Sequence, residues 1–138
     1  MGQPLSERIT SNLTYSTIEQ NAYSLLEGRL NAGSVYPEIW IRDLNTFILP
    51  KLEITPASEI RGILLNFFLI QGSDGNIPDN YIPITNPLQT SKNTVETDQE
   101  TSLIQAVYKY IKRTGDRSIL SEVVAGISVK SRMENALN

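Results

Sequence analysis

The chain has 138 residues, a formal net charge of -3, and neither cysteine nor histidine. Its length is that of one domain with its own core, so we expect a single domain over residues 1–138. The missing residue types exclude disulfide bonds, thiol nucleophiles, imidazole metal ligands and histidine-based triads. The 12 basic residues are scattered along the chain, which argues against a nucleic-acid partner.

Nothing in the sequence suggests a membrane or a metal. The N-terminus lacks the basic and apolar regions of a signal peptide, and the longest apolar run, Gly62 to Ile70, is too short to cross a bilayer. Asp74, Gly75 and Asp79 lack the regular spacing of a calcium loop and indicate a turn. We therefore expect a soluble cytoplasmic protein with no membrane partner, no metal and no cofactor.

The first half of the chain predicts three helices. Ser16 and Glu19 have capping-box spacing, and apolar residues follow at helical intervals until Gly33. A short helix is expected over 44–49, where Pro50 ends or kinks it. A third begins with Thr55 as cap and Pro56 in the first helical position, and runs to Gln71.

The second half predicts a long loop and two further helices. Residues 72–93 contain prolines and glycines without a sustained period, which indicates a loop. Thr97 and Glu100 have capping-box spacing and open a helix that ends at Gly115. Apolar residues from Arg117 to Ile127 predict a fifth helix, continued into the C-terminus. The expected class is all-α, built of antiparallel helical hairpins.

One stretch, "YPEIWIRDLNTFI" at 36–48, places two opposite charges in an otherwise apolar segment. A structural interpretation is that Asp43 caps a helix starting at Leu44, while Arg42 pairs with Asp43 or Glu38. Trp40 would then lie in the core. A functional interpretation depends on the order of motifs along the chain.

That order is a helix, "IWIRD", a helix ending in "QGSDGNIPD", a loop, and "TVETDQETSLIQAVYKYIKRTGD". It resembles the N-terminal part of the six-hairpin glycosidases, the glucoamylase-like families that fold as an (α/α)6 toroid. The resemblance covers about Thr17 to Leu120. It implies a partial toroid and a carbohydrate partner.

The resemblance also implies roles for particular residues. In glucoamylase-like enzymes a Trp-x-Arg-Asp motif lines the subsite for the non-reducing sugar, which matches Trp40, Arg42 and Asp43 here. An acidic residue at the start of a later helix also faces that pocket, and Asp98 is its counterpart. Glu38 departs from the pattern, which has an aromatic residue at that position. An alternative for Asp98 is that acidic residues in a first helical turn simply complement the helix dipole.

In these families the catalytic acid and base come from later helices, so the resemblance assigns no catalytic residue to this chain. We expect a glycosidase-like fragment that keeps part of a sugar-binding wall and is inactive alone. Missing neighbours would leave apolar surface exposed over 62–70 and 123–137, which predicts a homo-oligomer. The alternatives are one part of a split glycosidase and a small helical interaction module.

Overall fold

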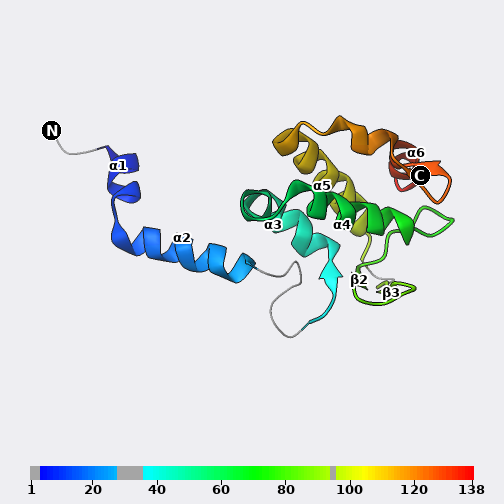
Figure 1. The fold of residues 1–138 in the computed structure, drawn as a ribbon, viewed down its shortest axis with the longest axis horizontal. Coiled ribbons are helices and arrows are strands. Elements are labelled where there is room, and N and C mark those ends of the chain that lie inside the picture. The colour runs from blue at the N-terminus through cyan, green and yellow to red at the C-terminus, as the bar shows by residue number, and fades with distance from the viewer. Residues whose placement is uncertain (1–3, 28–35, 94–95) are drawn as a thin grey trace.

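The computed structural model describes residues 4–27, 36–93 and 96–138. Helices dominate it, which confirms the predicted class in its coarse form. Figure 1 shows a body of packed helices, from which an N-terminal arm of two helices extends to one side. Among the described helices, none is both long and apolar enough to cross a membrane.

The arm consists of α1 (Leu5–Thr10) and α2 (Leu13–Leu26). The side chain of Asn12 caps α2 by accepting a hydrogen bond from the Thr14 N–H at 2.9 Å. The helix therefore begins before the predicted capping box at Ser16. It ends at Leu26, because Glu27 has extended backbone angles, and the predicted stop at Gly33 lies outside the described residues.

Three helices form the body: α3 (Ile41–Ile54), α4 (Ala57–Leu69) and α5 (Gln99–Thr114). The first is much longer than the predicted 44–49 segment and continues through Pro50. In α4, Pro56 occupies the cap position that the sequence assigned to Thr55. Gly115 ends α5 in the left-handed conformation, as predicted, with φ 77°.

α3 and α5 lie side by side and run in the same direction. Arg42 in the first turn of α3 contacts Glu96 just before α5, while Glu53 near the end of α3 contacts Arg113 near the end of α5. α4 runs the opposite way, since Arg61 near its start contacts Asp116 just after α5 ends. The body is thus a parallel helix pair connected by an antiparallel helix.

The core lies between these helices. Its buried apolar side chains come mainly from α3, α4 and α5, with Ile39, Ile77 and Tyr81 added from the segments before and between these helices and Ile119, Val124 and Val129 from the segment after α5. The apolar run 62–70 belongs to this core: Leu64, Phe67 and Phe68 are fully buried. The expectation of an exposed surface over 62–70 was therefore wrong for most of that run.

The predicted loop 72–93 contains two strands. β2 (Asn80–Ile82) pairs antiparallel with β1 (Ile39–Trp40) on one side and with β3 (Gln89–Ser91) on the other. Tyr81 lies opposite Ile39 and Thr90 in this register. The sheet connects the segment before α3 with the segment before α5.

The predicted fifth helix does not form. Instead the chain has a short 3-10 helix η1 (Arg117–Ser121), a hairpin of β4 (Val123–Val124) and β5 (Ile127–Ser128), and α6 (Val129–Asn135). Ala125 and Gly126 both have positive φ, at 47° and 83°, as the tightest hairpin turns require. The apolar periodicity of 117–127 was mistaken for a helix because the turn is only two residues long.

Candidate functional site

Arg42 is the centre of a charged cluster where the N-termini of α3 and α5 meet. Its Nη2 lies 2.5 Å from Glu96 Oε2, and its Nη1 lies 3.9 Å from Asp98 Oδ1. The hydrogen bond with Glu96 raises the pKa of Arg42. All three side chains are more than a third exposed, so the cluster remains open to a ligand.

The structure thus brings together Arg42 and Asp98, two of the sequence-predicted site residues. Glu96, which the sequence analysis did not select, is nearer to Arg42 than Asp98 is. Its signal in the sequence was its place in "ETDQE", two residues before Asp98.

Asp43 and Trp40 flank this cluster on the chain. Asp43 lies in the first turn of α3 and is half-buried; Trp40 is the residue before the helix and is also half-buried. Over residues 4–27, 36–93 and 96–138, no hydrogen bond or ion pair is made by the Asp43 carboxylate or the Trp40 indole N–H. The structural interpretation of this stretch was therefore wrong: Asp43 does not cap, and Trp40 is not in the core.

Two buried acceptor atoms lie near the start of α3. Within the described part of the chain, Glu38 Oε2 and Asn45 Oδ1 are buried without a hydrogen-bond partner. Asn45 uses only its amide nitrogen, which donates to Gln105 Oε1 at 3.1 Å. A buried acceptor without a donor costs free energy. Glu38, noted in the sequence only as a departure from the family pattern, is thus an unsatisfied group beside the predicted motif.

Asp79 fixes the two helix N-termini relative to each other. Its side chain, 4% exposed, accepts hydrogen bonds from the Gln99 amide and from the backbone N–H of Asn93. Its backbone oxygen accepts from the Ile41 N–H at 2.9 Å. One aspartate therefore contacts the first residue of α3 and the first residue of α5. Sequence reasoning placed Asp79 in a plain turn and missed this role.

Glu100 does not form the predicted capping box with Thr97. It accepts a hydrogen bond from the Ile77 N–H at 2.8 Å and pairs with Lys92 at 2.7 Å. Burial alone would raise the pKa of Glu100, but the hydrogen bonds from Ile77 and Lys92 lower it overall. The carboxylate therefore holds the connection after α4 against the start of α5.

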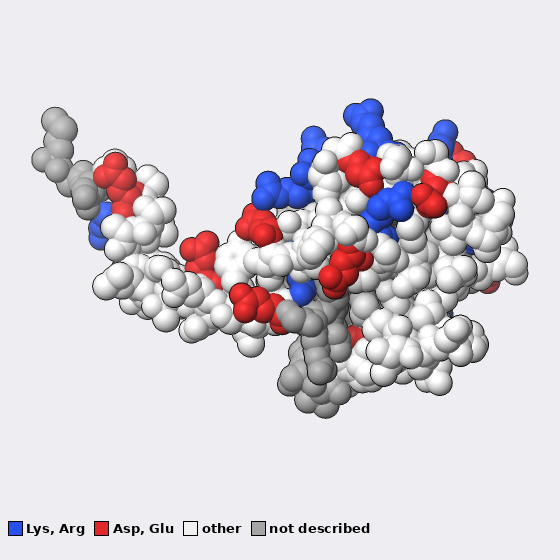
Figure 2. All heavy atoms as spheres, in the orientation of Figure 1, with Lys and Arg blue, Asp and Glu red and all other residues white. Residues whose placement is uncertain are grey.

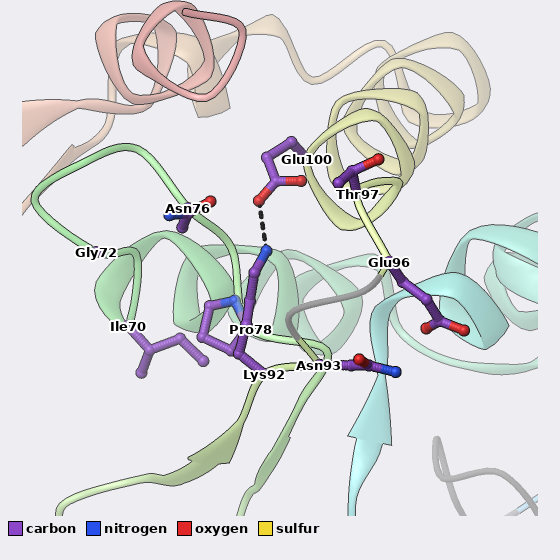
Figure 3. Close-up of a pocket in the computed structure, with 9 residues that line it drawn as sticks. All are labelled: Ile70, Gly72, Asn76, Pro78, Lys92, Asn93, Glu96, Thr97 and Glu100. Carbon is purple, nitrogen blue, oxygen red and sulfur yellow. Dashed lines mark hydrogen bonds and ion pairs between the residues drawn. The ribbon is translucent and has the colours of Figure 1, made fainter.

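A pocket of about 430 Å³ lies beside the charged cluster (Figure 3). Ile70 and Pro78 supply apolar wall, and the remaining lining is largely polar: Gly72, Asn76, Lys92, Asn93, Glu96, Thr97 and Glu100. The close-up shows the Lys92–Glu100 pair inside it, with Glu96 turned away from that pair. Glu96 therefore belongs to both the pocket wall and the Arg42 cluster, whereas Trp40, Arg42, Asp43 and Asp98 do not line the pocket.

The charged cluster offers a planar hydrogen-bond donor, the Arg42 guanidinium, and two carboxylate acceptors, Glu96 and Asp98, on an accessible surface. Among the described residues, no group of three or more acidic, histidine or cysteine side chains is arranged to hold a metal ion. Comparison of the sequence with family models, with curated proteins and with solved structures finds no match.

Proposed function

We propose that the charged cluster of Arg42, Glu96 and Asp98, with Asp43 and Trp40 flanking it on the chain, binds a sugar. The observation that carries the proposal is the Asp43 carboxylate, which follows Arg42 in the first turn of α3 and has no partner among the described residues. Its negative charge complements the dipole of α3, and its oxygens remain available to accept hydrogen bonds from hydroxyl groups.

The chemistry of the cluster suits vicinal hydroxyl groups. A guanidinium presents several N–H donors in one plane, and each carboxylate presents two acceptor oxygens. Neighbouring hydroxyls on a sugar ring can accept from the former and donate to the latter. The flat indole of Trp40 is suited to the apolar face of a pyranose ring.

The helix arrangement supports the larger part of the proposal, a glycosidase-like partial (α/α)6 toroid. A toroid of helical hairpins needs neighbouring inner helices that run parallel, each followed by an outer helix in the opposite direction. α3, α4 and α5 have these directions, and the cluster lies at the N-terminal end of the parallel pair. We assign no catalytic acid or base, so the proposed role is sugar binding, in the cytoplasm, without hydrolysis by this chain alone.

The test is an NMR titration of the 138-residue chain with a panel of monosaccharides. Trp40 is the only tryptophan, so its indole N–H signal is unambiguous. We expect saturable shifts at millimolar sugar, and we expect Arg42→Ala and Asp43→Ala each to abolish them.

Two matched controls come from the body, away from the site. Arg113 forms an exposed ion pair at the opposite end of α3 and α5, and Glu59 is an exposed acid in the first turn of α4. Arg113→Ala and Glu59→Ala should leave the shifts intact. If no sugar moves the indole signal of the folded wild-type chain, the sugar site is excluded and an interaction module becomes the better account.

A further inference from the structure

The N-terminal arm carries an apolar stripe that its own body does not cover. Tyr15, Ile18, Ala22 and Leu25 follow one another at intervals of three, four and three residues, the spacing of a helix seam that packs on another helix. All four are exposed, Leu25 at 86%. No residue of α1 or α2 is fully buried.

The arm touches the body near the end of α3 through two polar contacts. The Tyr23 hydroxyl donates to Glu53 at 2.5 Å, and the Lys51 ammonium donates to the Leu26 backbone oxygen. The rest of α2 leads away from the body in Figure 1. A helix of 14 residues rich in Ser, Thr and Asn is marginal in water by itself, so this one needs a partner surface.

The body presents a complementary surface on α5. The face of α5 turned away from the core carries Ile104, Tyr108 and Lys112, with Tyr108 62% exposed. The Lys112 ammonium lies 6.0 Å from the centre of the Tyr108 ring. Lys109, which donates to the Asn45 backbone oxygen at 2.6 Å, and Arg113, which pairs with Glu53, lie at the same end of the helix. Among the described residues, Lys112 is therefore the cation on this face without a hydrogen bond or ion pair to α3.

The charges of the two surfaces are opposite. In residues 4–27 the arm carries Glu7, Glu19 and Glu27 against Arg8, whereas the last two turns of α5 carry only basic charges. Figure 2 shows basic side chains along the upper edge of the body, with acidic ones between them, and mainly acidic side chains along the arm. Complementary charge favours the encounter of two such surfaces.

We propose that the arm of one copy packs its stripe on the exposed α5 face of a second copy, and receives that copy's arm in return. Because each chain carries both surfaces and its own arm leads away from its own body, a reciprocal exchange closes as a two-fold dimer and leaves neither surface exposed. The interface uses α2 and α5, not the surfaces over 62–70 and 123–137 that the sequence suggested, and it does not depend on the sugar site.

The first experiment measures the mass of the 138-residue chain in solution by light scattering, with circular dichroism to check that each variant is folded. We expect the wild type to have the mass of two chains. The double variant Ile18→Asp with Leu25→Asp should have the mass of one. Leu13, 83% exposed on the same helix but off the stripe, supplies the control: Leu13→Asp should remain dimeric.

The second experiment identifies the surface that receives the arm. Tyr108→Asp and Lys112→Glu should each weaken the dimer or abolish it. Mixing the Ile18→Asp, Leu25→Asp chain with the Tyr108→Asp chain should restore a mixed dimer, because one intact arm still meets one intact α5 face.

A wild-type chain with the mass of a monomer at high protein concentration would overturn the proposal. So would a Tyr108→Asp chain that dimerises like the wild type, since the arms would then pair with each other or with another surface. Equal loss of the dimer in Leu13→Asp would show that the stripe has no special role.

Discussion

Arg42 and Glu96 join the N-termini of two parallel helices through a contact of 2.5 Å, although they lie 54 positions apart in the chain. α4, β2 and β3 lie between them in the sequence. Both side chains are more than a third exposed. The contact therefore places two charged side chains on an accessible surface and is not a buried ion pair.

Glu96→Gln removes the negative charge of this pair and should change stability very little. Exposed ion pairs contribute little to folding, because solvent screens the attraction and ordering two long side chains costs entropy. We expect the urea midpoint of the variant to lie close to that of the wild type. Glu134→Gln, which removes the exposed Lys130–Glu134 pair of α6, is the matched control and should behave alike. A large loss of stability confined to Glu96→Gln would show that the pair is structural and would count against the sugar site.

Gly75→Ala should be strongly destabilising, whereas Gly62→Ala should be stabilising. Gly75 has φ 88°, and a Cβ there would lie 2.2 Å from the backbone oxygen of Asn135, which cannot move without shifting the end of α6. We expect a loss of about 2 kcal/mol or more from strain and the clash. Gly62 lies inside α4 with open space around it, so alanine should add about 0.5–1 kcal/mol. Urea unfolding measures the change in the free energy of unfolding for each variant. Equal changes in the two variants would contradict the prediction.

The helices that could be predicted from the sequence are those with a periodic apolar pattern and a recognisable end residue. The periodic apolar residues of α4 and α5 and the glycine at position 115 gave the body helices and the end of α5. The sequence singled out Asp98 and the motif that contains Arg42. The structure places Arg42 Nη1 3.9 Å from Asp98 Oδ1. Local patterns sufficed there because helix periodicity and end signals are local properties.

Contacts between distant segments could not be predicted in the same way. The strands at 80–82 and 89–91 are three residues each, too short for an alternating pattern to stand out, and they form because Ile39 and Trp40 supply a partner strand. Glu100 looked like half of a capping box but bonds Ile77, 23 residues earlier. Asp79 looked like a turn residue because its partners at Gln99 and Asn93 are defined only by the fold.

Glu100→Gln should flatten the loss of stability in acid. Because the pKa of Glu100 is lowered in the folded chain, the unfolded chain takes up the proton first as the pH falls. The stabilisation is present above the unfolded pKa of about 4.3 and is lost as the pH falls through the lower folded value. Below this pH, we expect the free energy of unfolding, measured with urea, to fall more steeply with decreasing pH for the wild type than for Glu100→Gln. Parallel curves would show that Lys92 and Ile77 do not favour the charged form.

The Tyr81→Phe variant should be less stable than the wild type near neutral pH and more stable than the wild type at high pH. The ring is fully buried against Phe67, with centroids 5.0 Å apart, and its hydroxyl accepts a hydrogen bond from Asn66 at 3.3 Å. Near neutral pH the variant keeps the ring packing and loses that bond, which costs about 1 kcal/mol. Burial raises the pKa of Tyr81 to about 12, so the unfolded chain, whose tyrosines titrate near 10, loses its proton first as the pH rises.

The wild type therefore loses stability between pH 10 and 12 through Tyr81, at up to about 1.4 kcal/mol for each pH unit, and the variant does not. The two curves of unfolding free energy against pH should converge above pH 10 and then cross. Tyr110, whose pKa burial also raises to about 12, remains in both chains, so its contribution cancels in the comparison. Urea unfolding from pH 8 upward measures the difference, and tyrosine absorbance should show one fewer late-titrating group in the variant. Curves that stay a constant distance apart would mean that the Tyr81 hydroxyl reaches solvent and ionises as readily in the folded chain as in the unfolded one.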